Sequence, residues 1–412
     1  MRILFLSNFY PPASRGGYEQ WCQEVLDGLR SRGQDVIVLT SDFGVDRLSD
    51  PDPAWVRRSL HLEMELASFK NALQFFTRRK KREQENLDQV RSLVKGFQPD
   101  VVLVWGMWNL HRSIPALVEE LLPGRVVYYM GDYWPTLPDQ FENYWNAPAR
   151  NLLTGLPKLI LKPFALRILA REKRLPLKLD HVLFATDFMQ NQYRQNGITP
   201  PHTRIIYGAV DTKPYLNDHQ RIGSRTSLLS IGRLHPEKGV HTAIEAVGHL
   251  VREYGCEEKD LHLTIVGDGE AEYLSQLRSL VERENLASFV DFLPAQPKEA
   301  LPALYRHADI FLFTAIWNEP FGRVIVEAMA SGVAVVGTRV GGATEILVEE
   351  ENSLTFPPGD AAVLAGQIKR LIDSPDLRAR LAGSGRQTAT TKFDLTRMTT
   401  EIEAYLDSLT KS

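Results

Sequence analysis

The sequence predicts an α/β protein that contains two doubly wound parallel sheets. Short apolar runs rich in β-branched residues alternate with helical segments along most of the chain, which is typical of parallel sheets. This alternation occurs twice, once in the first half of the chain and again from Ser227 onwards. A chain of 412 residues is also long for one hydrophobic core and sufficient for two.

Five short apolar runs predict the strands of the first series. They cover residues 2–7, 36–40, 101–105, 126–130 and 182–185. A helix around Trp21 follows the first strand and ends at Gly33. Gly16 and Gly17 precede this helix, where a glycine pair could let the backbone approach a ligand such as a diphosphate. A flexible surface turn is the alternative explanation of the pair.

A second series of strands and helices begins near Ser227. Its expected strands cover residues 228–231, 261–266, 290–292, 309–314 and 333–338. The repeat predicts a first domain at 1–208 and a second at 209–394. A final helical segment within 395–412 has little sheet left to cover in the second domain.

Composition and charge exclude several classes of protein. The formal net charge of −3 argues against a globally basic nucleic-acid binder. Cys22 and Cys256 lie far apart, so the sequence predicts neither a disulfide framework nor a metal site, and a reducing cytoplasm fits. No uninterrupted apolar stretch reaches the roughly 20 residues that a membrane span requires.

The most informative stretch runs from residue 318 to residue 332, between two expected strands. It holds Glu319 in a loop and Glu327 in a short apolar helix. The N–H groups of Phe321 and Gly322 can attract an anion, because free N–H groups and the helix dipole meet at a helix start. Glu327 needs polar partners, because apolar residues surround it. A surface glutamate followed by a structural ion pair is the alternative.

A basic loop at residues 232–239 follows a strand and precedes a helix. Arg233 offers a planar fork for phosphate oxygens and Lys238 a compact point charge, so together they could stabilise a departing diphosphate. A solvated basic turn is the alternative, and the P-loop pattern does not occur here. Glycine turns at Gly267 and at residues 341–342 mark two more strand ends.

As a set, these motifs resemble those of the retaining glycosyltransferases of family 4. The resemblance spans most of residues 227–356 and extends more loosely to the first half of the chain through Gly16 and Gly17. It implies the GT-B fold, in which two Rossmann-like domains face a central cleft. The first domain would bind the acceptor and the second the donor, while the final helix crosses back to the first domain.

The resemblance also implies a role for each motif residue. Glu319 would contact the donor sugar, Glu327 would hold the ribose hydroxyls, and the cations of the basic loop would hold the diphosphate. The residues expected to bind the donor are Gly16, Gly17, Arg233, Lys238, Gly267, Glu319, Phe321, Gly322 and Glu327.

One position departs from the family pattern. Many members carry a histidine after the strand that corresponds to residues 126–130, and this chain has Gly131 followed by Asp132. Asp132 is therefore a catalytic candidate beside Glu319, Arg233 and Lys238, and could replace that histidine. An aspartate that caps a turn is the alternative, and backbone and Glu319 alone could also hold the sugar.

The reaction implied is transfer of a sugar, with retention of configuration, from a UDP-, GDP- or ADP-sugar to a hydroxyl acceptor. We expect neither a cofactor nor a metal, since Arg233 and Lys238 can replace a divalent cation and no Asp-x-Asp motif is evident. A non-catalytic subunit that binds nucleotide sugars, and a transferase for a soluble small acceptor, are the alternatives. A phosphorylase would need a pyridoxal-phosphate lysine, which we do not identify.

The first half of the chain contains two basic stretches. Residues 78–82 follow a group of apolar residues, and residues 150–178 alternate cations with apolar residues. Such segments can lie in the headgroup layer of an anionic membrane, so we expect a cytoplasmic enzyme that sits on the inner leaflet and modifies a lipid-linked or polysaccharide precursor. A basic helical hairpin packed on the sheet, with its cations in water, is the alternative.

Overall fold

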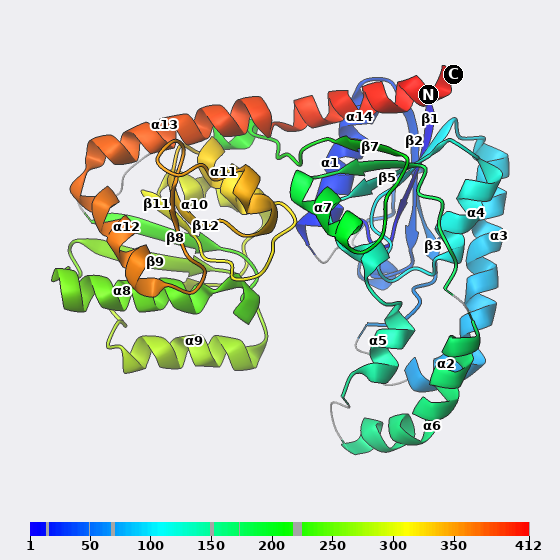
Figure 1. The fold of residues 1–412 in the computed structure, drawn as a ribbon, viewed down its shortest axis with the longest axis horizontal. Coiled ribbons are helices and arrows are strands. Elements are labelled where there is room, and N and C mark those ends of the chain that lie inside the picture. The colour runs from blue at the N-terminus through cyan, green and yellow to red at the C-terminus, as the bar shows by residue number, and fades with distance from the viewer. Residues whose placement is uncertain are drawn as a thin grey trace. The chain divides into compact units, whose positions relative to one another are not determined.

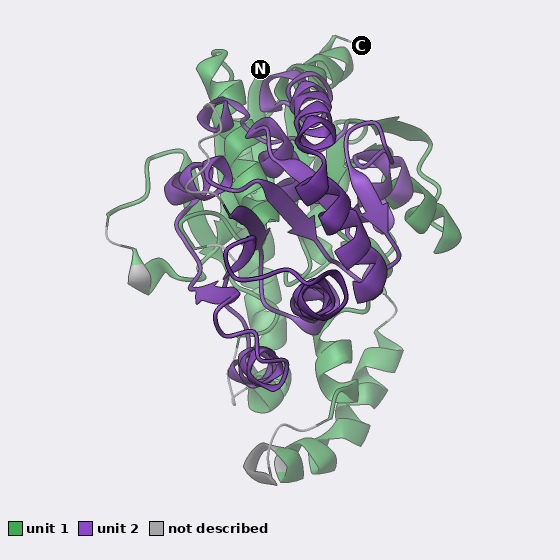
Figure 2. Ribbon diagram, turned by 90° about the vertical axis from the view of Figure 1, so that its left-hand side faces the viewer, with its two compact units in different colours: residues 1–185, 189–206, 399–412 green, residues 186–188, 207–398 purple. Residues whose placement is uncertain are grey.

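The structure is a computed structural model that describes residues 1–13, 16–48, 50–66, 71–148, 152–172, 174–216 and 225–411. The side chains of residues 47, 152–154 and 157 lie outside this description. The chain divides into two compact units (Figure 2). Unit 1 comprises residues 1–185, 189–206 and 399–412, and unit 2 comprises residues 186–188 and 207–398.

Unit 1 contains a seven-stranded parallel sheet in the order β3-β2-β1-β4-β5-β6-β7 (Figure 1). Its strands are β1 (Arg2–Ser7), β2 (Asp35–Ser41), β3 (Val56–Leu60), β4 (Val101–Val104), β5 (Val126–Met130), β6 (His181–Phe184) and β7 (His202–Ile205). The strands predicted from the sequence did not include β3 and β7, the two edge strands. An edge strand is covered less than a central one, so neither carries a continuous apolar run: β3 contains two arginines and β7 is largely exposed.

The central strands of unit 1 and its first helix follow the predicted pattern. β4 and β5 are wholly buried. Helix α1 (Gly17–Ser31) buries Trp21, Val25 and Leu29 at helical spacing, and Gly33 follows it with a φ of 84°. Helix α4 (Ser113–Leu121) connects β4 to β5, and α7 (Asp187–Gln195) connects β6 to β7. This arrangement places the loops after β1, β4 and β5 at one edge of the sheet.

The last helix, α14 (Leu395–Thr410), belongs to unit 1 from residue 399 onwards. Its Glu403 accepts hydrogen bonds from Arg32 at 3.1 Å and from Gln34 at 2.7 Å. Its Tyr405 hydroxyl lies 3.0 Å from His181 Nδ1. These contacts hold the helix to the end of α1 and to β6.

Three helices of unit 1 form a lobe that extends away from its sheet: α2 (Asn71–Thr77), α5 (Gln140–Asn146) and α6 (Leu152–Arg171) (Figure 1). This lobe has a small core of its own, made by Ala72, Phe75, Phe141, Trp145 and Ala165. Helix α3 (Arg79–Phe97) follows α2 and connects the lobe to β4. Among the described residues, no helix is long and apolar enough to cross a membrane.

Unit 2 contains a six-stranded parallel sheet in the order β10-β9-β8-β11-β12-β13. Its strands are β8 (Thr226–Ile231), β9 (Leu261–Val266), β10 (Val290–Leu293), β11 (Ile310–Phe313), β12 (Ala334–Thr338) and β13 (Leu354–Phe356). The helices are α8 (Val240–Tyr254), α9 (Ala271–Arg283), α10 (Leu301–Arg306), α11 (Arg323–Ala330), α12 (Ala361–Asp373) and α13 (Pro375–Lys392). The two parallel sheets confirm the predicted fold class, although the three-residue β13 was too short to predict.

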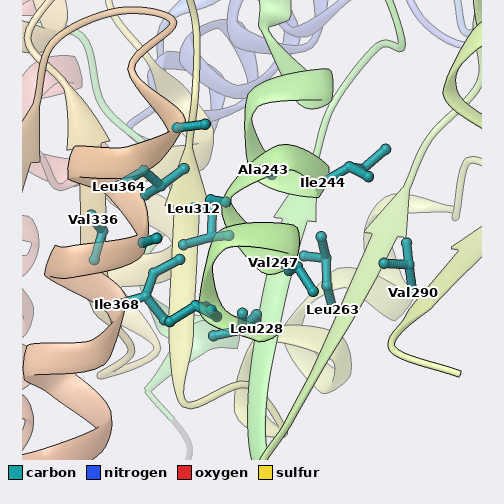
Figure 3. Packing of buried hydrophobic residues seen from close by; sticks show 14 of the residues in the cluster. Leu228, Ala243, Ile244, Val247, Leu263, Val290, Leu312, Val336, Leu364 and Ile368 are labelled. Carbon is teal, nitrogen blue, oxygen red and sulfur yellow. The ribbon is translucent and has the colours of Figure 1, made fainter. Parts of the chain in front are cut away.

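The core of unit 2 lies between its sheet and the pair α8 and α12 (Figure 3). Leu228, Leu263 and Leu312 project from neighbouring strands, and Val247 and Ile368 meet them from the two helices. All five side chains are essentially inaccessible to water. Truncating such a side chain to alanine typically costs about 2–5 kcal/mol. The packed core fixes the strand ends from which the loops of the candidate site emerge.

Candidate functional site

The carboxyl ends of β8, β9, β11 and β12 carry the loops that the motifs predicted. Gly267, after β9, has a φ of 152° and lies so close to the β8 loop that a Cβ atom would stand 1.9 Å from the Gly232 carbonyl oxygen. The N–H groups of Gly232 and Leu234 donate to the carbonyls of Val266 and Asp268 at 3.0 and 2.8 Å. Gly267 is therefore needed where two loops join, which gives it a structural role whether or not it touches a donor.

Lys238 and Glu319 form the centre of the site in unit 2. The Lys238 Nζ lies 2.5 Å from Glu319 Oε2, and the indole Nε1–H of Trp317 donates to the same oxygen at 2.8 Å. The ammonium also lies 5.1 Å from the centre of the Trp317 ring. The exposed fractions of the Lys238 and Glu319 side chains are 23% and 18%, so water screens the pair only in part. An anionic ligand would thus compete with Glu319 for Lys238.

The position of Lys238 is fixed through its backbone. Its carbonyl accepts the Thr314 hydroxyl at 2.9 Å, and the Glu237 carbonyl accepts the N–H of Ile316 at 2.9 Å. Gly239 follows with a φ of 63°, and a Cβ there would stand 2.0 Å from the Thr314 carbonyl oxygen. The loop after β8 is therefore bound closely to the loop after β11. This contact brings together two motifs that are about 80 residues apart, as in parallel sheets generally.

Arg233 shares the β8 loop with Lys238 and is exposed. Within the described ranges it makes no hydrogen bond or ion pair, and it is held only by its backbone neighbours Gly232 and Leu234. A guanidinium without an internal carboxylate partner keeps its donors available for phosphate oxygens. The two cations therefore differ in the structure: Arg233 is available to a ligand, whereas Lys238 is paired with Glu319, a pairing that was not predicted.

The backbone of Glu319 rests on the glycine turn after β12. The Gly342 N–H donates to the Glu319 carbonyl at 2.6 Å. Gly341 has a φ of 55°, and a Cβ at this position would stand 2.2 Å from the same carbonyl oxygen. A Cβ at position 342 would stand 2.2 Å from the Pro320 carbonyl oxygen. Glycine at both positions lets the turn after β12 pack directly against the backbone of Glu319 and Pro320.

Phe321 and Gly322 start helix α11 in different ways. The Phe321 ring is 3% exposed and packs against Phe393 at a ring-centre distance of 5.6 Å, so only its main chain remains for a ligand. Gly322 is the residue before the helix and has a φ of 110°, which favours glycine. Together they open an eight-residue helix whose first N–H groups need acceptors.

Glu327 is 6% exposed and lies in α11, as the apolar sequence around it predicted. The Tyr305 hydroxyl of α10 donates to Glu327 Oε2 at 3.1 Å and lies 3.4 Å from the Val324 carbonyl. Burial and the negative charge of Glu327 hold the pKa of Tyr305 well above its usual value, so the phenol remains a donor. The sequence predicted that Glu327 needs a partner, but no motif identified Tyr305.

Asp132 follows β5 in unit 1. Its carboxylate accepts the Trp134 N–H at 3.3 Å, and burial, followed by the negative charge of Glu19, raises its pKa to about 7. The carboxyl group is therefore balanced between its two protonation states near neutral pH. The short hydrogen-bonded loop also fits the capping alternative, so the catalytic role of Asp132 stays a prediction.

The position of the Tyr18 side chain accounts for the presence of glycine at position 131, just before Asp132. Its hydroxyl donates to the carbonyl of Tyr129 at 2.6 Å, and it accepts the Gly131 N–H at 3.3 Å. A Cβ at position 131 would stand 2.8 Å from the Tyr18 ring and 3.4 Å from Trp21. In this chain the aromatic ring thus fills the space into which a side chain at position 131 would project.

Gly16 and Gly17 lie just before Tyr18 in unit 1. Gly17 begins α1, whereas Gly16 is exposed and extended with a φ of −172°, a conformation that any residue adopts. A Cβ at position 16 would stand 3.6 Å from Glu19 Oε2, so Gly16 has no steric requirement for glycine like that of Gly341. Donor binding by the pair stays a prediction. In the part of the chain that the structure describes, no group of three His, Cys, Asp or Glu side chains is arranged to hold a metal.

Trp317 and Tyr305 contribute to the site, and neither was predicted from the sequence. Trp317 stands only two residues before Glu319, so its proximity to the loop carboxylate was a usable signal. Tyr305 lies 22 residues before Glu327, in a helix that carries no motif of its own. Only the packing of α10 on α11 brings that hydroxyl to the carboxylate.

Two protein-family models match the chain in succession. The Glycosyltransferase Family 4 model matches residues 15–214, and the model described as glycosyl transferases group 1 matches residues 213–388. Glycogen synthase of Mycobacterium tuberculosis is 31% identical over 205 residues, which are 49% of this chain and 48% of that protein. D-inositol 3-phosphate glycosyltransferase of Acidothermus cellulolyticus is 32% identical over 196 residues, 45% of this chain and 43% of that protein. The chain thus aligns with about half the length of these curated relatives.

Solved structures share the fold over the whole chain. A glycosyltransferase from Rickettsia africae has a TM-score of 0.73 at 18% identity, covering 100% of this chain and 99% of its own. Anabaena HepE, solved with UDP and glucose, has a TM-score of 0.67 at 21% identity, covering 98% and 99%. Sucrose-phosphate synthase from Thermosynechococcus elongatus has a TM-score of 0.72 at 19% identity, covering 100% of both chains. These neighbours have the GT-B fold.

Proposed function

Because the chain belongs to the family 4 and group 1 glycosyltransferases, we propose that it moves a sugar from a nucleoside-diphosphate sugar to a hydroxyl acceptor with retention of configuration. The observation that carries this proposal is the grouping of Lys238, Glu319 and Trp317 at the carboxyl edge of the unit 2 sheet, with Arg233 on the same loop as Lys238. That edge is where open α/β sheets bind ligands.

The donor would be held at three points in unit 2. Arg233 and Lys238 would bind the diphosphate, the N–H groups at the start of α11 would add hydrogen bonds, and Glu327 would hold the ribose hydroxyls. Binding of the diphosphate would draw Lys238 away from Glu319 and release that carboxylate towards the sugar. The loop glycines support this arrangement, since they hold both side chains on closely packed backbone.

In the reaction, the bond between the sugar C1 and the diphosphate oxygen breaks, and its electron pair leaves with the phosphate. The acceptor oxygen forms the new bond to C1, and its hydroxyl proton passes to the departing diphosphate. Arg233 and Lys238 would stabilise the charge that develops on the phosphate, which is the role a divalent metal has in other transferases. We therefore propose a metal-independent reaction. Transfer should persist in EDTA, and a rate that falls in EDTA and returns with Mg²⁺ would contradict it.

For the donor, UDP-sugars are the first candidates among UDP-, GDP- and ADP-sugars. This order is supported by a neighbour of the same fold, since HepE was solved with UDP and with UDP-glucose.

For the acceptor, we propose a lipid-linked or polysaccharide precursor at a membrane surface. Its support is the exposed apolar lobe of unit 1. A soluble small-molecule acceptor is the alternative, and it would leave that lobe without a function.

The test combines binding with turnover. Thermal-shift titrations with UDP, GDP and ADP should show one nucleotide stabilising the protein, by about 2.7 kcal/mol at a hundred times its dissociation constant. Arg233→Ala should weaken that binding, whereas Glu319→Gln should keep it and lose most, but not all, of the transfer of the sugar. A folded Glu319→Gln variant with full activity would refute the assignment. Nucleotide binding without turnover of any acceptor would favour a non-catalytic binding subunit.

A further inference from the structure

The strongest unexplained surface of the molecule is the exterior of the α2–α5–α6 lobe. Six large apolar side chains there are well exposed: Leu73 at 64%, Phe76 at 39%, Leu156 at 64%, Leu159 at 71%, Ile160 at 58% and Phe164 at 63%. They come from two helices that share one small core. Among the described residues, the other large exposed apolar side chains come from both units, and none is more than 45% exposed. A concentrated apolar surface of this kind marks an interaction site.

The exposed face of α6 changes character along the helix. Leu156, Leu159, Ile160 and Phe164 recur at helical spacing, and the same face continues with the exposed Arg167 and Arg171. The apolar half of this face is at the beginning of α6, in the part of the lobe furthest from the sheet (Figures 1 and 2). An apolar tip followed by cations matches the order of acyl chains and anionic headgroups in a bilayer.

Most of the cations in the stretch 78–82 are paired with glutamates of unit 1. Arg79 makes two hydrogen bonds to Glu172 at 2.6 and 2.8 Å. Arg82 lies 2.8 Å from Glu65, Lys80 3.0 Å from Glu83, and Lys81 3.7 Å from Glu85. The stretch 78–82 therefore fits the packed-hairpin alternative better than a membrane-binding role.

The second basic stretch is only partly available. Lys158 is 8% exposed, donates to the Ala147 carbonyl at 2.7 Å and lies over the Tyr144 ring, so it supports the lobe from inside. Arg150 and Lys173 lie outside the described residues. On α6, Arg167 and Arg171 are exposed cations, and within the described ranges neither makes an ion pair. Lys178, beyond the helix, is exposed as well. The exposed face of α6 therefore carries more apolar side chains than unpaired cations.

We propose that the lobe docks on a lipid bilayer by inserting the apolar tip of α6, with Arg167 and Arg171 at the headgroup level. Burial of hydrocarbon drives this binding, and headgroup charge adds only an increment. The inference rests on the proposed function in one respect, since it places the acceptor unit of a glycosyltransferase where a lipid-linked acceptor lies. The docking itself depends only on the surface of the lobe.

The experiment is flotation of the full-length protein with vesicles of phosphatidylcholine alone and of phosphatidylcholine mixed with phosphatidylglycerol. We expect binding to both, and persistence at about 1 M salt, where the Debye length falls to about 3 Å. The double variant Leu159→Gln, Phe164→Gln should lower the partition coefficient by roughly a hundredfold, since burying each side chain contributes about tenfold or more. Both residues are more than 60% exposed, so the variant should fold.

Three control variants make the result specific. Val363→Gln changes an exposed apolar residue of unit 2 and should bind as wild type. Lys80→Gln with Lys81→Gln should also bind as wild type, because both lysines are already paired. Arg167→Gln with Arg171→Gln should remove only the extra binding to the anionic vesicles.

Several outcomes would overturn the inference. Binding confined to anionic vesicles, abolished by salt and unaffected by the Leu159 and Phe164 changes, would show electrostatic attachment instead. A dimer that the same double variant converts to a monomer, without vesicle binding, would assign the surface to a second copy of this chain. Nucleotide binding measured on the same samples separates the two proposals, because the docking variants should bind UDP as wild type does.

Discussion

Replacing Trp317 by phenylalanine tests whether Glu319 acts at the reacting sugar. The change removes the indole N–H that donates to Glu319 Oε2 at 2.8 Å and keeps a ring beside Lys238. A hydrogen bond to a charged group contributes about 1.5–3 kcal/mol. The Glu319 side chain is 18% exposed, so water screens its charge in part and the lower value applies. A loss of about 1.5 kcal/mol corresponds to roughly a tenfold lower kcat.

The assay follows transfer of radiolabelled sugar at saturating donor, and the UDP dissociation constant is measured in parallel. We expect kcat to fall about tenfold with the UDP dissociation constant unchanged, because Trp317 acts through Glu319 and not through the diphosphate. In a Glu319→Gln background the same change should have little further effect, since its target is already altered. An unchanged kcat, or equal losses in both backgrounds, would refute the reasoning.

Three further changes probe the remaining parts of the site. Tyr305→Phe removes the donor to the buried Glu327 and should lower the free energy of unfolding by about 1–3 kcal/mol and weaken UDP binding, as denaturant titration and calorimetry would show. Gly341→Ala places a Cβ against the Glu319 carbonyl at a φ of 55° and should reduce kcat more than Gly359→Ala, a glycine of positive φ with open space around its Cβ; equal effects would count against a supporting role of the turn. The raised pKa of Asp132, about 7 against an ordinary 3.8, means that the folded state holds a proton that the unfolded state has lost between these values, so its contribution to stability falls as pH rises through that window. Asp132→Asn should flatten that decline in pH-dependent unfolding, and an unchanged slope would show that Asp132 is not the group responsible.

The sequence was most informative where the chain repeats one simple unit. Buried parallel strands must be apolar on both faces, so β8, β9 and β11 stand out as short runs of Leu, Ile, Val and Phe. Loops that leave such strands share one edge, and this predicted that Arg233, Lys238 and Glu319 belong to one site. The strands β3 and β7 could not be recognised by an apolar run, because edge strands need less apolar surface.

Pairings across long sequence distances could not be predicted in the same way. That Lys238 is paired with Glu319, and Glu327 with Tyr305, depends on how helices and loops pack, and spacing alone does not encode that packing. The stretch 78–82 shows the converse problem. Its charges suggest a surface for anionic membranes, yet Glu172 and Glu65 from two other segments, with Glu83 and Glu85 of the same helix, neutralise much of it. Charge composition reveals how many cations are present, but not how many remain unpaired.

The ring of Tyr18 and the missing side chain of Gly131 share one volume of space, because a Cβ at position 131 would overlap the ring. Evolution can therefore not change the two positions independently. Among descendants of this sequence, an imidazole after β5 requires a smaller residue at the second position of α1, and a tyrosine there keeps the glycine in place. The two positions are therefore expected to covary as a compensated pair.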